Sequence, residues 1–127
     1  MKDSWKGKNI NLSLLTDRIM QFFILKGFKV SLKKKKGKYS IIAIPQRFHE
    51  ITEKVSVNVL GESDNFTIEF VAGSFSRALV LHAPFLSLIL GGYLVKKGIT
   101  SLEKLEALEK EFWSYVDETI LFLESIR

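Results

Sequence analysis

Residues 55–71 read VSVNVLGESDNFTIEFV and carry two alternating patterns from which the fold class can be inferred. Its first half alternates valine with polar residues, and its second half alternates Phe66, Ile68 and Phe70 with Thr67 and Glu69. A period of two is typical of a strand with one buried face. The polar segment between the two halves is too short for a parallel crossover, so the stretch predicts an antiparallel hairpin.

A second hairpin is predicted upstream of the first. Alternation at Val30 and Leu32 leads into a lysine-rich segment, residues 33–38, and then into the apolar run 39–44 before Pro45. We expect the turn at Lys36-Gly37, because glycine permits the backbone angles of tight turns. The two hairpins together give four antiparallel strands.

Helices are expected on both sides of these strands. Apolar residues at three- and four-residue spacing predict a helix over Leu12–Lys26, ended by the glycine that follows. Residues 78–95 predict a largely buried second helix, closed by Lys96-Lys97-Gly98, and the capping-box spacing of Thr100 and Glu103 predicts an amphipathic third. The fold class is therefore α+β, in the order α-β-β-β-β-α-α, with a four-stranded antiparallel meander sheet packed by helices.

The length and composition describe one domain. The 127 residues are 46% hydrophobic, which excludes disorder, and we expect a single α+β domain over residues 1–127 with residues 1–10 as a flexible N-terminal segment. The chain has no cysteine, which excludes disulfide scaffolds, thiol chemistry and zinc fingers. The N-terminus has no signal-peptide pattern, so a cytoplasmic location is expected.

The net charge of +5 conceals an asymmetry. Residues 1–60 hold 13 Lys/Arg and 4 Asp/Glu, a net +9, whereas residues 61–127 hold 6 and 10, a net −4. Much of the excess lies in the predicted lysine hairpin, at Lys33, Lys34, Lys35, Lys36 and Lys38.

Two interpretations of the lysine hairpin stay open. Lysines on an outer hairpin prevent a strand edge from pairing with other chains. The same lysines form a candidate site for nucleic acid or another polyanion, of low sequence specificity because the run contains no arginine. Other lysines near the hairpin or in the N-terminal segment would enlarge such a patch: Lys2, Lys6, Lys8, Lys26 and Lys29.

Residues 78–95 are nearly uncharged, at the lower edge of the length that spans a membrane. His82, Pro84 and the Gly91-Gly92 pair disfavour insertion, so a buried helix is preferred to a membrane span. Small residues recur every four positions at Ala83, Ser87 and Gly91, where another backbone could approach closely.

The predicted sheet also has apolar side chains opposite its clean apolar face, at Ile42, Ile44, Leu60 and Val71. This surplus of apolar surface argues for self-association or for a bound apolar ligand. The candidate interface or pocket residues are His82, Ala83, Ser87, Gly91 and Tyr93, with His82 or Tyr93 as the polar contact for a ligand.

Catalytic chemistry has no recognisable constellation in the sequence. Only two histidines are present, and His49 with Arg47 and Glu53 matches no metal-ligand spacing. We therefore assign no catalytic residue, no metal and no cofactor, and an enzyme is not favoured.

The leading hypothesis is a small non-enzymatic interaction protein that acts as a homodimer or complex subunit. The first alternative is low-specificity nucleic-acid or polyanion binding through the basic hairpin. The second is binding of an apolar small ligand between the sheet and the second predicted helix.

Overall fold

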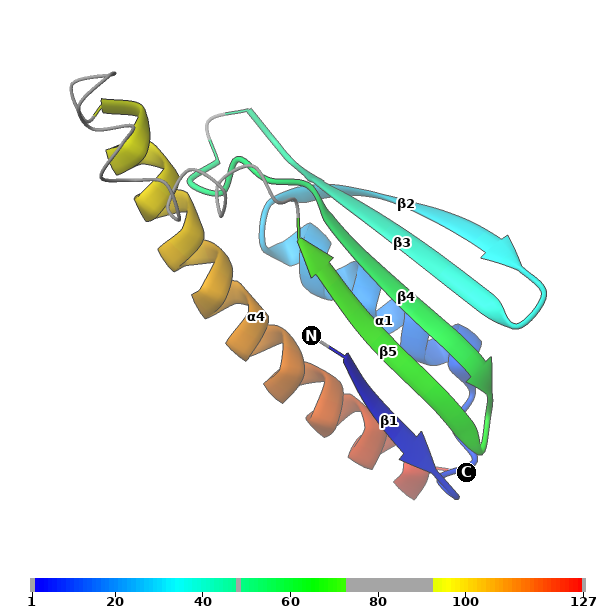
Figure 1. Cartoon of the computed structure of the whole chain (residues 1–127). Helices are drawn as coiled ribbons and strands as arrows, with labels where there is room; N and C mark the ends of the chain where they lie inside the picture. Colours follow the sequence, from blue (N-terminus) through cyan, green and yellow to red (C-terminus); the bar gives the residue numbers. More distant parts are fainter. Residues whose placement is uncertain (1, 48, 73–92, 127) are drawn as a thin grey trace.

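The computed structural model describes residues 2–47, 49–72 and 93–126, and for residues 93–102 it describes the backbone alone. Its elements are β1 (Lys2–Lys6), α1 (Leu12–Leu25), β2 (Phe28–Lys35), β3 (Lys38–Pro45), β4 (Val55–Glu62), β5 (Asn65–Ala72) and α4 (Tyr93–Ser125). The fold is α+β, as predicted, with five antiparallel strands in one open sheet and two helices packed against it (Figure 1).

Strands β2, β3, β4 and β5 form the predicted four-stranded meander. The sheet order is β1-β5-β4-β3-β2, so strands that follow one another from β2 to β5 are neighbours. The β2–β3 turn lies at Lys36-Gly37, as expected, and Gly37 has a φ of 69°. In the β4–β5 hairpin Val57 pairs with Phe70 and Val59 with Ile68, which brings the two alternating apolar rows onto the same face.

The fifth strand corrects the expectation that residues 1–10 are a flexible segment. Lys2–Lys6 pairs antiparallel with β5, with Trp5 opposite Phe66. The Trp5 ring stacks on Phe66 at 5.4 Å between centroids and lies 6.5 Å from the ring of Trp113 on α4. The segment was missed because KDSWK has a single apolar residue, whereas an edge strand needs only one such anchor when its backbone pairs with a neighbour.

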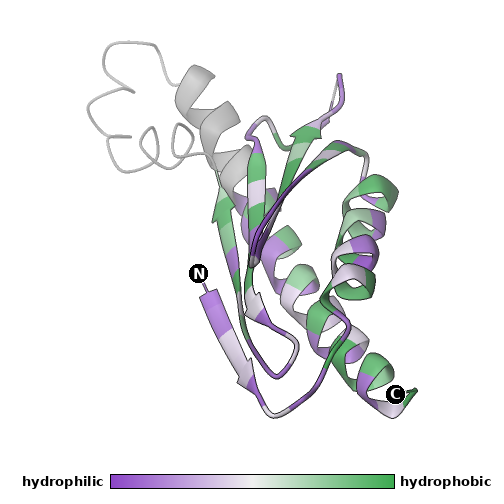
Figure 2. Cartoon of the chain, turned by 90° about the vertical axis from the view of Figure 1, so that its right-hand side faces the viewer, coloured by the Kyte–Doolittle hydropathy of each residue, from purple (hydrophilic) through white to green (hydrophobic). Residues whose placement is uncertain are grey.

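Both helices lie on the same side of the sheet (Figures 1 and 2). Helix α1 begins at the N-cap Asn11, whose Oδ1 accepts a hydrogen bond from the Leu14 amide at 3.2 Å, and ends before Gly27, which has a φ of 91°. This confirms the first predicted helix. Glycine is the residue that adopts such a φ without strain, so it stops the helix and turns the chain into β2.

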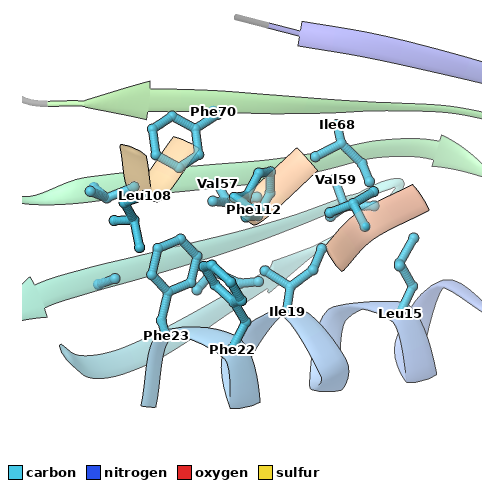
Figure 3. Close-up of a cluster of buried hydrophobic side chains, with 14 of the residues drawn as sticks. Leu15, Ile19, Phe22, Phe23, Val57, Val59, Ile68, Phe70, Leu108 and Phe112 are labelled. Carbon is cyan, nitrogen blue, oxygen red and sulfur yellow. The ribbon is translucent and has the colours of Figure 1, made fainter. Parts of the chain in front are cut away.

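The core lies between the helices and the sheet, and aromatic rings fill its centre (Figure 3). Phe112 of α4 is fully buried and lies 5.9 Å from Phe22, 5.8 Å from Phe23 and 5.0 Å from Phe70, measured between ring centroids. These contacts join α1, α4 and β5. The core thus buries one face of the sheet and leaves the other outside the helix layer.

The C-terminal helix corrects a second expectation. We expected one helix to stop at Gly98 and another to begin at Thr100, but α4 runs without a break from Tyr93 to Ser125. A glycine inside a helix is less favourable than alanine by about 1 kcal/mol, which a long helix tolerates. The rest of the predicted second helix, residues 78–92, lies outside the described residues.

In the part of the chain that the structure describes, none of the helices is both long and apolar enough to span a membrane.

Candidate nucleic-acid interface

Strand pairing brings six lysines onto one face of the sheet. One row of cross-strand partners runs from Lys33 through Ser40, Asn58 and Glu69 to Lys2. Side chains in register with this row, two residues apart along each strand, point to the side opposite α1 and α4. We call this the open face; its lysines are Lys2, Lys6, Lys29, Lys33, Lys35 and Lys38. Its acidic residues in the strands are Glu62 and Glu69, so lysine dominates its charge.

Hydrogen bonds between side chains fix the middle of the open face. Ser40 Oγ donates to Asn58 Oδ1, and Asn58 Nδ2 donates to Glu69 Oε1, each at 2.9 Å. The Ser4 and Thr67 hydroxyls share a further hydrogen bond of 2.8 Å between β1 and β5. The open face therefore has a fixed polar centre, with lysines along both margins.

The five lysines of the predicted site divide between the two sides of the hairpin. Lys33, Lys35 and Lys38 lie on the open face. Lys34 lies on the other side, with its Nζ 5.4 Å from the centroid of the Tyr39 ring, and Lys36 lies in the turn. This is the alternation expected from the sequence.

Among the lysines expected to enlarge the patch, three join it and two do not. Lys2, Lys6 and Lys29 share the open face. Lys26 pairs instead with Glu111, and Lys8 with Glu124 at 3.4 Å, so both cations face the acidic helix α4. The sequence could not separate the two groups, because the pairing of β1 with β5 decides where Lys2 and Lys6 lie.

A hollow of about 560 Å³ lies beside the hairpin on its helix-facing side. Lys34, Lys35 and Lys36 line it together with Tyr39 and the first residues of α1. No acidic residue lies in the first turn of α1. The surroundings of the hairpin tip are therefore cationic on this side as well.

The apolar residues predicted opposite the core are confirmed on the open face. Ile44 is 51% exposed and Val71 44% exposed, and Ile42 and Leu60 are half-buried beside them. They lie among the polar and basic side chains described above. The open face is thus mixed in character and is not a uniform apolar sheet.

His49 has a structural role. Its Nδ1 accepts a hydrogen bond from the Ile51 amide at 2.9 Å, so its Nε2 carries the hydrogen and donates to the Lys26 carbonyl oxygen at 2.8 Å. Its ring packs against Phe28 at 4.7 Å between centroids. Both ring nitrogens are therefore hydrogen-bonded to backbone groups. Across residues 2–47, 49–72 and 93–126, no group of three His, Asp or Glu side chains is placed to bind a metal ion.

The predicted interface or pocket residues His82, Ala83, Ser87 and Gly91 lie outside the described residues. Tyr93 is the first residue of α4, and its side chain is not among those described.

Comparisons of the chain with protein-family models, with curated proteins and with solved structures find no match.

Proposed function

We propose that the protein binds nucleic acid through the phosphate backbone, on the open face of the sheet, without reading the base sequence. The observation that carries this proposal is the placement of six lysines with two glutamates on that face. Lysine contacts with phosphate release counterions from the nucleic acid and supply affinity that does not depend on sequence. Base-specific contacts come mostly from arginine and amide side chains, whereas the cations here are lysines.

The spacing of the lysines suits an extended polyanion. Lys33 and Lys35 are neighbours on one face of β2, about 7 Å apart along the strand. Lys2 and Lys6 lie at the opposite margin of the sheet, about 19 Å away across four strand spacings. Two lysine margins with a fixed polar centre between them can hold phosphates at both sides of a bound strand or duplex.

Protection of the sheet edge accounts for only part of this arrangement. Lys33 and Lys35 lie on the edge strand β2, where lysine disfavours pairing with other chains. Lys38 lies on β3, which is paired on both sides by β2 and β4 and has no edge to protect. Its position on the open face therefore favours a binding role over edge protection alone.

The test is the binding of a fluorescein-labelled 20-base-pair DNA duplex of arbitrary sequence, followed by fluorescence anisotropy over a salt series. Lys33→Ala/Lys35→Ala removes two open-face cations, and Lys34→Ala/Lys36→Ala is its matched control on the same hairpin. For duplex DNA each lost phosphate contact lowers the magnitude of the log-log salt slope by about 0.9, so the first variant should lower it by about 1.8. The control should lower it by less than half as much.

Binding that does not change with the sequence of the duplex, and that weakens with salt, supports the proposal. It is wrong if the wild-type protein does not bind DNA or RNA duplexes or single strands at low salt. It is also wrong if the two double variants lose affinity equally, since the open face would then have no special part in binding.

A further inference from the structure

The helix layer carries most of the large hydrophobic side chains that are exposed in the described part of the chain. Nine large hydrophobic side chains are exposed in the described part of the chain, and six of them belong to the helix layer or to the residue just after it. These six are Leu14, Ile24, Leu25, Leu121, Phe122 and Ile126. Leu25 is 82% exposed and Leu121 62% exposed, which leaves most of each side chain in water.

Two hollows lie along the groove between α1 and α4, and a third lies at its end, beside the β4–β5 turn. The first, of about 610 Å³, is lined by Leu25, Glu111 and Ser114 among others. The second, of about 210 Å³, is lined by Arg18, Glu118 and Phe122, and the third, of about 400 Å³, by Leu14 and Ile126. Charged side chains therefore line the first two hollows beside apolar ones, and the third has no charged side chain in its lining.

The charges along the groove are divided between the two helices. Helix α1 contributes Arg18, whose guanidinium lies 5.4 Å from the centroid of the Phe122 ring, and is followed by Lys26. Helix α4 contributes Glu111 and Glu118 together with Lys110. The α1 side of the groove thus carries two cations, and the α4 side carries two carboxylates and one cation.

Contacts within the chain fix which residues of the two antiparallel helices lie level. Lys26 lies level with Glu111, because the two form an ion pair. Arg18 lies level with Tyr115 and Phe122, because its carbonyl accepts a hydrogen bond from the Tyr115 hydroxyl at 2.9 Å and its side chain covers the Phe122 ring.

We infer that a second copy of this chain docks on the helix layer. In a dimer whose two-fold axis runs parallel to the helices, each residue lies at the same position along that axis in both copies. The rotation also exchanges the two sides of the helix layer, so α1 of one copy lies over α4 of the other. Arg18 then faces Glu118 of the partner copy, and the two cations of each α1 side meet the net negative charge of the other copy's α4 side. Such an interface is self-complementary, as a two-fold dimer requires, and covers Leu25 and Leu121.

The dimer has a consequence that rests on the proposed function. Face-to-face packing of two helix layers turns the two open faces outward in opposite directions. Each dimer then presents two lysine surfaces on opposite sides and can link two segments of nucleic acid.

The test is the molar mass of the full chain, measured by size-exclusion chromatography with light scattering over a dilution series. We expect about 29 kDa at high concentration, twice the 14.5 kDa of one chain, falling toward 14.5 kDa on dilution. Leu25→Asp should give a monomer at all concentrations. Because this side chain is 82% exposed, the substitution leaves the fold intact, which the circular dichroism spectrum checks.

Charge reversal tests the predicted pairing of the two helices. Arg18→Glu and Glu118→Arg should each weaken the dimer, and the double variant should restore it. Glu62→Arg, the same kind of change on the open face, is the matched control and should leave the mass unchanged. A wild-type monomer at every concentration, a dimer insensitive to Leu25→Asp, or a double variant that stays monomeric would each overturn the inference.

Binding and association fail independently in these experiments. A dimer that does not bind DNA removes the proposed function and leaves the interface standing. A monomer that binds DNA with the predicted salt slope removes the interface and leaves the proposed function standing.

Discussion

Trp5→Ala tests the role of the strand that the sequence did not reveal. The Trp5 ring joins β1 to the core through Phe66 and Trp113, and the side chain is half-buried. Truncation to alanine removes about 100 Å² of the apolar area that is buried on folding, which at about 25 cal/mol per Å² corresponds to about 2.5 kcal/mol of stability. Because the denatured chain is itself partly compact, the expected loss is about 2 kcal/mol. Ring stacking adds about 1 kcal/mol, so we expect a decrease of about 3 kcal/mol in the free energy of unfolding.

The assay is urea denaturation followed by circular dichroism at 222 nm, which does not depend on the tryptophan signal. With a slope of about 1.5 kcal/mol per molar urea, the midpoint should fall by about 2 M. Trp5→Phe keeps an aromatic ring on Phe66 and should lose less than half as much. If the urea midpoint of Trp5→Ala decreases by less than about 0.3 M, or if Trp5→Phe loses as much stability as Trp5→Ala, stacking by this ring does not anchor β1.

Three further predictions concern single side chains. Thr16 is 1% exposed, and its hydroxyl has no hydrogen-bond partner in the described structure, so Thr16→Val should stabilise the protein by about 1 kcal/mol and raise Tm by about 4 °C in calorimetry. A lower Tm would contradict this. Gly61 has a φ of 113°, and an added Cβ would lie 2.3 Å from the Asn65 carbonyl oxygen, so Gly61→Ala should destabilise by about 2 kcal/mol or more in urea. An unchanged midpoint would show that the turn rearranges without cost. His49→Phe leaves two backbone groups without their partner, one of them the Ile51 amide, and should lower the free energy of unfolding by about 2 kcal/mol. Equal stability in urea would show that water replaces both hydrogen bonds.

The sequence predicted those parts of the fold in which local pattern and tertiary packing agree. Alternating apolar residues in β4 and β5 predicted both strands and their shared buried face, since a period of two leaves one arrangement that buries all three valines of β4. Gly37 marked the turn of the first hairpin and Gly27 the end of α1, in each case at a positive φ. These features depend on residues close together in the chain.

The features that were missed depend on distant partners. Strand β1 has one apolar residue in five, and it is a strand because β5 offers it a free edge. The continuity of α4 through Gly98 likewise contradicts a local stop signal, because the cost of one glycine is small beside the stability of a long helix.

About half of the candidate interface could be predicted from the sequence. The lysine run of β2 and β3 and its division between two faces followed from strand periodicity. The contribution of Lys2 and Lys6 depends on the register of β1 against β5, which could not be predicted from the sequence. The separation of Lys8 and Lys26 from the patch followed from their ion pairs with α4.

The open face has methyl groups that can report directly on whether nucleic acid binds there. Ile42, Ile44, Leu60 and Val71 have methyl groups on that face, whereas Leu25 and Leu121 have exposed methyl groups on the helix layer. The measurement is a methyl-labelled NMR titration with a 20-base-pair DNA duplex at low salt. We expect chemical-shift changes in the open-face methyl groups that disappear as salt is raised, with little change at Leu25 and Leu121. Changes confined to the helix layer, or none anywhere, would contradict binding on the open face.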